Sequence, residues 1–385
     1  MPADHYLDFA ATSALRPPEV ADAVADFLRD CGATPGRGSH HRALDAGRMV
    51  FRTRRALARL LGLHEEPGQV VFGAHATQAI NTVLGSLDPG QVLVVTDLDH
   101  NAVLRPAHHL AGAGIEVRRV AADPRGELDP DSLERALDGA DLLTVNAASN
   151  VLGSRLPVGE IAQRARSAGA RVLVDTAQTA GHLVDDLAGA DYVAITGHKG
   201  LLAPQGIGAL WIREGAPIRP LLRGGTGGNS LDREMPAALP DRLEAGTLNA
   251  PGIAGLAAGI DWLEREGVEA IHRRLSVLRL RLHDGLAGVA GVRVLSPRDP
   301  AGAPIVTAVS DRLDPGALAH GLDRRFGVQT RSGHHCAPEV HRLLRTTRAG
   351  AVRFSLGWCS TEADVDRAVE GVEALTAFPE RSVPR

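Results

Sequence analysis

The chain contains a single lysine, Lys199, among 42 basic residues, and the other basic residues are all arginines. Arginine can replace a lysine that solvates a surface or pairs with a carboxylate, but a guanidinium does not lose its proton and attack an aldehyde. Codon bias toward arginine could also leave one lysine at any position. Because Lys199 comes directly after a predicted strand, in the segment Thr196-Gly197-His198-Lys199, we consider it a candidate for Schiff-base formation with an aldehyde.

Other polar residues that follow predicted strands bear on the same chemistry. Asp175 ends the run Val-Leu-Val-Asp, Gln178 lies three residues later, and His100 follows Asp99. With Lys199 they supply what pyridoxal phosphate requires: an amine, a carboxylate for the pyridine nitrogen, a contact for the phenolic oxygen and a flat ring to stack on the cofactor. Structural explanations also exist, since Asp175 could cap a helix and His100 could be a buried structural histidine.

The phosphate of such a cofactor needs hydrogen-bond donors, and a predicted helix begins near Thr77. Backbone amides at a helix N-terminus attract anions. Thr77 and the amides of Ala76 and Gln78 are therefore candidate phosphate ligands, and an N-cap role for Thr77 would be compatible with this.

Two other cofactor classes fit the sequence less well. A dinucleotide site needs Gly-x-Gly-x-x-Gly between a strand and a helix, but Gly112-Ala-Gly114 lacks the third glycine and Gly206-Ile-Gly208 leads into a predicted strand. Zinc could use His108-His109 or His334-His335-Cys336, but adjacent ligands rarely chelate one ion and the chain has no Cys-x-x-Cys pair. We therefore expect no metal.

The elements that must position these residues alternate in type along the first two thirds of the chain. Short β-branched runs separated by amphipathic stretches indicate parallel strands with helical crossovers. The expected strands are 70–72, 92–96, 115–120, 142–146, 171–175, 192–196 and 207–212, and the expected helices include 77–86, 129–137 and 158–168. This predicts an α/β fold with a doubly wound, mostly parallel seven-stranded sheet, which binds ligands beyond the carboxyl ends of its strands.

The last third has a pattern typical of a smaller α+β domain. A long arginine-rich helix is expected from Gly252 to Gly285, then strands at 292–295 and 305–309 and a helix at 361–376. We predict a large domain at residues 15–251 and a small domain formed by residues 1–14 and 252–385. Glycines at 224–228 and the polar stretch to Asp241 predict a mobile surface loop, and the tail 379–385 is expected to fray.

Composition narrows the class of function. The 385 residues are 44% hydrophobic and 23% charged with a formal net charge of −4, so we expect neither disorder nor nucleic-acid binding. Three cysteines are too few for a disulfide framework, and the first ten residues lack a signal-peptide pattern, which favours the cytoplasm. No apolar run is long enough for a membrane span. An enzyme acting on a small molecule fits these features.

Seven short motifs follow one another along nearly the whole chain. They are Tyr6-Leu-Asp-Phe-Ala-Ala-Thr12, Asp99-His100, Ser149-Asn-Val-Leu-Gly153, Val174-Asp-Thr-Ala-Gln178, Gly197-His-Lys199, Glu244-Ala-Gly-Thr247 and Arg331-Ser-Gly-His-His-Cys-Ala337. In this order they resemble the class V aminotransferase family of fold-type I pyridoxal phosphate enzymes and, within it, the cysteine desulfurases. The short Gly-His-His-Cys-Ala segment resembles the SufS-like, or group II, branch.

The resemblance implies roles for the cofactor-binding residues. Lys199 carries the cofactor, Asp175 pairs with the pyridine nitrogen, Gln178 contacts the phenolic oxygen and His100 stacks on the ring. The residues implied to contact the phosphate are Thr77, Thr196 and His198, with Thr247 reaching the phosphate of a partner subunit. A homodimer is therefore implied.

The resemblance also implies how substrate is held and converted. Asn150, Arg353 and Arg331 are expected at the substrate, with Arg353 as the clamp for its α-carboxylate. L-cysteine displaces Lys199 from the cofactor, and Lys199 then acts as the base at Cα. Cys336 takes the substrate sulfur as a persulfide, alanine leaves, and the persulfide passes to an acceptor protein or thiol. The charges of His334, His335 and Arg331 are expected to stabilise the Cys336 thiolate, which is the reactive form.

Several residues depart from the group II pattern and leave alternatives open. Cys359-Ser360-Thr361 stands where Tyr-Asn-Thr is common, Asn101 where a second histidine is common, and Thr226 interrupts the usual Gly-Gly-Gly. The alternatives are selenocysteine lyase activity, and a pyridoxal-phosphate-dependent C–S β-lyase or aminotransferase in which Cys336 is dispensable. A non-catalytic cofactor-binding regulator is disfavoured because the chain has no helix-turn-helix or basic segment.

Overall fold

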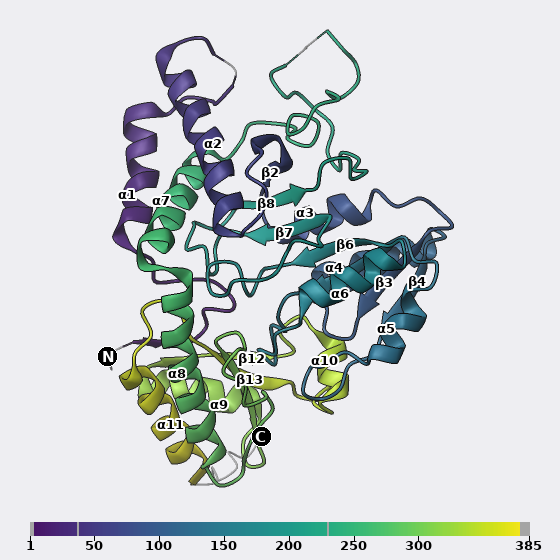
Figure 1. Cartoon of the computed structure of the whole chain (residues 1–385). Coiled ribbons are helices and arrows are strands. Elements are labelled where there is room, and N and C mark those ends of the chain that lie inside the picture. Colours follow the sequence, from purple (N-terminus) through teal and green to yellow (C-terminus); the bar gives the residue numbers. More distant parts are fainter. Residues whose placement is uncertain (1–3, 37, 229–230, 378–385) are drawn as a thin grey trace, which may run out of the picture.

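A seven-stranded sheet forms the centre of the computed structural model, which describes residues 4–36, 38–228 and 231–377 (Figure 1). Its strands are β2 (Val70–Gly73), β3 (Val92–Thr96), β4 (Glu116–Val120), β5 (Leu142–Asn146), β6 (Arg171–Asp175), β7 (Tyr192–Thr196) and β8 (Gly208–Ile212). Their order is β2-β8-β7-β6-β5-β3-β4. The pairs are parallel except those of β8, which is antiparallel to β2 and β7. The predicted mostly parallel seven-stranded sheet is confirmed.

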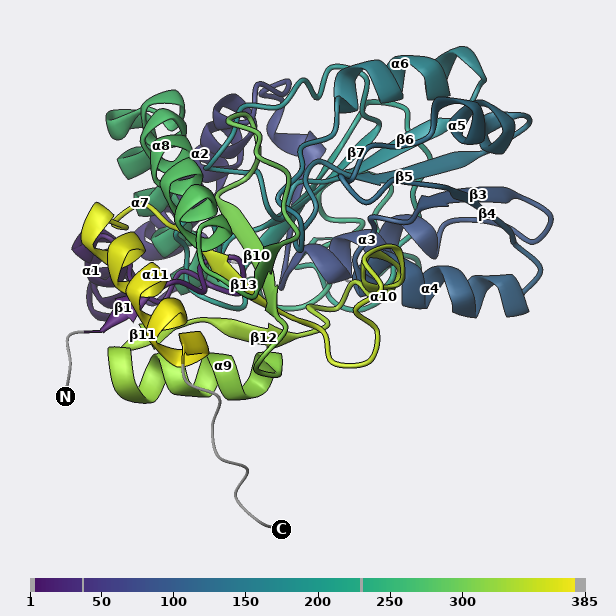
Figure 2. The ribbon, with the colours of Figure 1, turned by 90° about the horizontal axis from the view of Figure 1, so that it is seen from below.

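Helices cover both faces of this sheet (Figure 2). On one face lie α5 (Pro130–Leu137) and α6 (Val158–Ser167), and on the other lie α3 (Ala76–Leu84) and α4 (Asn101–Gly112). Every residue of β3, β5, β7 and β8 is consequently buried. This explains why these strands are continuous apolar runs rather than alternating patterns.

The C-terminal part of the chain builds a second, antiparallel sheet. Its order is β12-β13-β10-β9, formed by β9 (Val292–Val294), β10 (Ile305–Ser310), β12 (Arg331–Gly333) and β13 (Ala351–Ser355). Around it lie α8 (Val268–Ala287), α9 (Pro315–Gly321) and α11 (Glu362–Ala377) (Figure 2). The short helix α10 (Pro338–Leu343) lies toward the central sheet, where its Glu339 pairs with Arg119 of β4. The first strand, β1 (His5–Tyr6), pairs in parallel with β11 (Val328–Gln329), so the N-terminus joins the C-terminal part. The exact domain limits stay a prediction.

The structure differs from the sequence-based expectations in several elements. The single helix expected from Gly252 to Gly285 is wrong: α7 (Ala250–Glu266) and α8 are separate helices. Between them Gly267 has φ +80°, which lies outside the helical region. The sequence analysis also predicted neither the short elements β1, β11, β12, α9 and α10, nor α1 (Pro18–Asp26), α2 (His41–Leu60), the π-helical turns 27–31 and 322–326, and the 3₁₀ turn 67–69.

The sequence analysis predicted two flexible segments, residues 224–241 and 379–385. The described residues of the segment 224–241 contain neither helix nor strand, and its mobility stays a prediction. The tail 379–385 lies outside the described residues.

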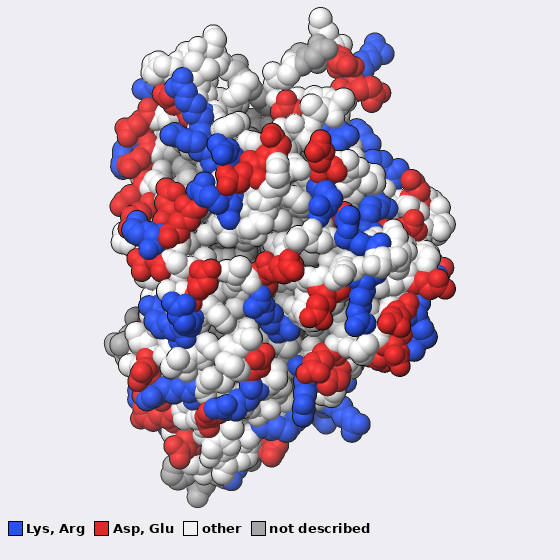
Figure 3. Space-filling view, in the orientation of Figure 1, with Lys and Arg blue, Asp and Glu red and all other residues white. Residues whose placement is uncertain are grey.

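The surface shows no large area of one charge on the face in Figure 3, where basic and acidic side chains are interspersed. Among the described residues, no helix combines the length and apolar character that crossing a membrane requires.

Candidate active site

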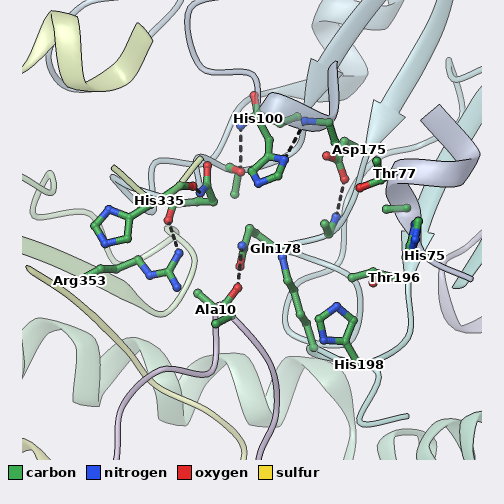
Figure 4. A pocket seen from close by; sticks show the side chains of 18 of the residues that line it. Ala10, His75, Thr77, His100, Asp175, Gln178, Thr196, His198, His335 and Arg353 are labelled. Carbon is green, nitrogen blue, oxygen red and sulfur yellow. Dashed lines mark hydrogen bonds between the residues drawn. The ribbon is translucent and has the colours of Figure 1, made fainter. Parts of the chain in front are cut away.

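A cavity of about 220 Å³ lies at the carboxyl ends of the central strands (Figure 4). Three neighbouring strands β5, β6 and β7 end in polar residues that line it, namely Asn146, Asp175 and Thr196. This is the edge at which a doubly wound sheet binds ligands. The cavity brings together eleven of the thirteen predicted site residues: Ala76, Thr77, His100, Asn150, Asp175, Gln178, Thr196, His198, Lys199, Arg331 and Arg353.

Lys199 and Asp175 form the electrostatic centre of the cavity. Burial lowers the pKa of Lys199 to about 8, although the carboxylate of Asp175 acts in the opposite direction. A larger share of the amine is therefore neutral at pH 7 than for an ordinary lysine, as a nucleophile requires. Burial raises the pKa of Asp175, while the Ala177 N–H, 2.9 Å from its Oδ1, stabilises the carboxylate. No helix begins at Asp175 in the described chain, so its structural role is to close a turn.

His100 combines a structural role with a place at the cavity. It is the N-cap of α4, and its Nδ1 accepts a hydrogen bond of 3.0 Å from the Ala102 N–H. Burial, helped by nearby Lys199, lowers the pKa of His100 to about 4, so the ring is neutral. A neutral, fixed ring in this position could stack on a flat aromatic ligand.

The start of α3 forms the opposite side of the cavity from Arg353 (Figure 4). His75 is the N-cap, and Ala76 and Thr77 occupy the first helical positions. The Gln78 N–H donates to His75 Nδ1 at 3.1 Å, and its expected contact with a phosphate stays a prediction. A Cβ at Gly208 would lie 2.7 Å from the Cα of His75, so a glycine there allows the sheet to approach the helix start. Ala76 and Thr77 remain available to an anion.

Two arginines face each other on the C-terminal sheet at the other end of the cavity. Arg331 on β12 is paired in register with Arg353 on β13. Arg353 is 1% exposed, which excludes an ordinary surface arginine. Its Nη2 donates to Asp8 Oδ1 at 2.8 Å and its Nη1 donates to the Asn150 carbonyl at 3.1 Å. This end of the cavity is suited to a carboxylate.

Cys336 does not line this cavity but lies in an adjoining one, which shares Thr77, His100 and Ala102 with it. Its carbonyl accepts a 2.8 Å hydrogen bond from the Asn101 N–H, directly after His100. The half-buried thiol therefore belongs to a loop that is attached to the start of α4.

The Cys336 loop, residues 334–337, has an unusual backbone. His335 and Cys336 have φ +50° and +59°, a region that non-glycine residues rarely adopt. The Asn150 side chain donates to the His335 carbonyl at 2.6 Å, and the Ala337 N–H donates to the His334 carbonyl at 3.0 Å. The loop conformation is thus fixed by contacts from outside it as well as within it.

The expected charge of His335 next to Cys336 is wrong. Burial lowers the pKa of His335 to about 3, and its ring packs against buried His341 at 5.6 Å between centroids. His335 is therefore neutral at pH 7. The positive charge expected at position 335 is therefore absent.

Thr247 is the other predicted site residue outside the cavity, and it is exposed on the chain surface. Its expected role concerns a partner subunit and stays a prediction. Among the described residues, no group of three or more His, Cys, Asp and Glu side chains is arranged to hold a metal ion.

Sequence reasoning missed some residues of the site. Asn146 lines the cavity with a buried Oδ1 that has no hydrogen-bond partner among the described residues, as does Asn150. Its position at the end of the run Leu-Leu-Thr-Val-Asn was a usable signal. Asp8 lies inside a quoted motif, but nothing in that motif indicates its contact with Arg353.

The family and its members match this chain over almost its full length. The family model for class V aminotransferases matches residues 5–368. A probable cysteine desulfurase of Methanothermobacter thermautotrophicus is 34% identical, with 97% of this chain and 96% of that protein covered. A cysteine desulfurase of Cronobacter sakazakii is 33% identical, with 95% and 92% covered.

A solved structure gives the same result for the fold. The apo cysteine desulfurase of Thermococcus onnurineus superimposes with a TM-score of 0.89 at 31% identity, covering 97% of this chain and 94% of that one. The chain therefore belongs to the class V aminotransferase family, whose enzymes depend on pyridoxal phosphate.

Proposed function

We propose that the protein is a cysteine desulfurase, which removes sulfur from L-cysteine and leaves alanine and a persulfide on Cys336. The relatives described above carry this name. The observation that carries the proposal is the attachment of the Cys336 loop to α4 directly beside His100, which places a thiol next to the cavity.

The residues of the cavity fit pyridoxal phosphate. Lys199 supplies the amine, Asp175 a carboxylate for the pyridine nitrogen, and the neutral ring of His100 a stacking surface. The unpaired Oδ1 atoms of Asn146 and Asn150 can accept hydrogen bonds from a ligand. We assign the phosphate to the start of α3, with Thr196 and His198 beside it, and the phenolic oxygen to Gln178. When bound, the cofactor withdraws electrons from the substrate carbons.

Different side chains of this protein bind the substrate and transfer its protons. Arg353 and Arg331 bind the α-carboxylate, with Asn150 beside them, and so orient the amino acid. Lys199, whose pKa is lowered to about 8 by burial, is suited to hold a proton taken from Cα and return it. The carboxylate of Asp175 would hold the pyridine nitrogen of the cofactor and favour its protonated form.

Cys336 performs the sulfur transfer. Its thiolate attacks the substrate sulfur, the new S–S bond forms and the Cβ–S bond breaks. The electron pair of the broken bond stays with the substrate carbon, which takes up a proton and leaves as alanine. The persulfide then requires a nucleophilic thiol in an acceptor, so we propose a sulfur-acceptor protein as partner.

The oligomeric state, the branch and the location form part of the same proposal. We propose a homodimer in which Thr247 contacts the cofactor phosphate of the partner subunit. We also propose the domain limits given above. The short segment between β12 and α10 supports the SufS-like branch. Three free cysteines, with a thiol as the working group, support a cytoplasmic location.

The test is L-cysteine turnover with alanine, sulfide and pyruvate all measured in the presence of a reducing thiol. We expect equal amounts of alanine and sulfide from the parent, none from Cys336→Ala, and parental rates from Cys359→Ala, whose thiol is also half-buried. Full activity of Cys336→Ala, or pyruvate in place of alanine, would contradict the desulfurase and support a β-lyase. Amino transfer to a keto acid would support an aminotransferase.

A further inference from the structure

Asp8 is a partly buried neighbour of the site that the mechanism above does not use. It lies in the loop after β1 and reaches Arg353 from 345 residues away in the chain, with 2.8 Å between Oδ1 and Nη2. Its side chain is 21% exposed, against 1% for Arg353. Asp8 is not among the residues that line the cavity. It therefore contacts the guanidinium without itself lining the cavity.

The backbone around Asp8 is fixed by β13, the strand that carries Arg353. The Ser355 N–H donates to the Leu7 carbonyl at 2.7 Å, and the Ala10 N–H donates to Ser355 Oγ at 2.9 Å. These bonds lie on both sides of Asp8. The distance between Asp8 and Arg353 is thus set by main-chain pairing rather than by a flexible surface contact.

The charges around the Arg353 guanidinium make its contact with Asp8 important. Burial lowers the pKa of Arg353, Arg331 lowers it further, and Asp8 acts in the opposite direction. Like charges placed opposite each other in a sheet repel, and Arg331 is the register partner of Arg353. Without Asp8, the buried guanidinium would keep only its bond to the Asn150 carbonyl among its described hydrogen bonds. One hydrogen bond does not fix the orientation of the planar guanidinium group.

We infer that Asp8 is a positioning residue, which fixes the guanidinium of Arg353 so that its free N–H groups face the carboxylate of an amino acid. The inference rests on the proposed function in taking the cavity as the site of an amino acid. It assigns no proton transfer to Asp8. A purely structural role would affect all ligands equally, whereas this role concerns ligands with a carboxylate.

The experiment compares two ligands that differ only in the carboxylate. L-alanine and ethylamine are titrated into the holoenzyme, and their dissociation constants are measured from the change in cofactor absorbance. For Asp8→Ala we expect L-alanine to bind about 10-fold more weakly and ethylamine to bind as in the parent. Asp8→Asn keeps an acceptor oxygen for Nη2, so we expect it to recover most of the L-alanine affinity.

A double-mutant cycle supplies the control. In an Arg353→Ala background, Asp8→Ala should have no further effect on L-alanine binding. Tighter L-alanine binding by Asp8→Ala would show that Asp8 competes with the substrate and would overturn the inference, as would equal changes for both ligands or no change. These titrations need no desulfurase turnover, so failure of the proposed function would be seen separately, in the products formed from L-cysteine.

Discussion

The strand-end side of the cavity and the Cys336 loop are built in opposite ways. Asn146, Asp175 and Thr196 each end a strand of one sheet, and their mutual positions follow from its register. His335 and Cys336 instead adopt left-handed backbone angles, which cost on the order of 1 to 3 kcal/mol per residue. Contacts from Asn150 and Asn101 offset this cost.

This difference indicates which function a substitution in each region should impair. The side chains at the strand ends supply charges and protons from a rigid frame, so their replacement removes chemistry and leaves the frame intact. The loop supplies a thiol whose position depends on a few hydrogen bonds. Loss of one such bond should reduce sulfur transfer without affecting the cofactor.

The largest effect is expected at Lys199. Lys199→Arg keeps a positive charge but removes the amine, and we expect turnover of L-cysteine to fall by at least about 10⁴-fold. Borohydride reduction should fix the cofactor to the Lys199 peptide of the parent and leave the variant unlabelled. Arg223→Lys provides the control, because it adds a second, exposed lysine that should stay unlabelled. Labelling of the control protein at position 223 alone, or any labelling of the Lys199→Arg protein, would contradict the assignment.

Asp175→Asn tests the charge at the pyridine nitrogen. The amide keeps an acceptor oxygen for the Ala177 N–H, so the turn should survive. We expect turnover to fall by about 10³-fold, since preorganised charge is worth roughly this much. Asp186→Asn, an exposed neighbour, should retain the parental rate. Retention of more than a tenth of the activity by Asp175→Asn would show that its charge does not matter.

The sequence predicted the strand-end side well because its signals are local. A polar residue after a buried apolar run marks a strand end, and the run Val-Leu-Val-Asp identified both β6 and Asp175. The expected bounds of β3, β5, β6 and β7 agree with the structure for the same reason.

The remaining features depend on contacts between distant segments. Asp8 and Arg353 are 345 residues apart in sequence, and no local pattern connects them. The neutral state of His335 follows from its burial against His341, which the motif alone does not show. The helix break at Gly267 was missed because an isolated glycine inside a helical pattern is often tolerated.

The buried carboxyl group of Asp99 should make the free energy of unfolding depend on pH. Burial raises its pKa to about 7, and its Oδ2 accepts from the Thr96 N–H at 2.7 Å. Because of the raised pKa, the folded state still holds a proton on Asp99 at pH values above 4, where the unfolded state has released it. The contribution of Asp99 to the free energy of unfolding is therefore fully present below pH 4 and is lost as the pH rises toward 7. Between pH 4 and 8, the free energy of unfolding of the parent should fall relative to that of Asp99→Asn by up to about 4 kcal/mol.

Urea unfolding of both proteins at several pH values measures this difference. Titration of groups that do not interact with Asp99 cancels in the comparison, because the two chains differ at one position. Parallel curves would show that the pKa of Asp99 is the same in the folded and the unfolded protein, and would contradict the raised value.

The smallest effect concerns the Cys336 loop and its bond to α4. Asn101→Pro replaces the N–H that donates to the Cys336 carbonyl with a ring CH₂, which removes the bond and pushes this carbonyl away, while proline is well tolerated at the first position of a helix. Loss of one such bond corresponds to about 1 kcal/mol, so we expect persulfide formation to slow by at least about 5- to 10-fold with cofactor absorbance unchanged. Asn101→Ala keeps the N–H and should retain the parental rate. If both variants slow equally, the side chain rather than the backbone bond matters, and if neither slows, the loop is held by Asn150 and its own turn alone.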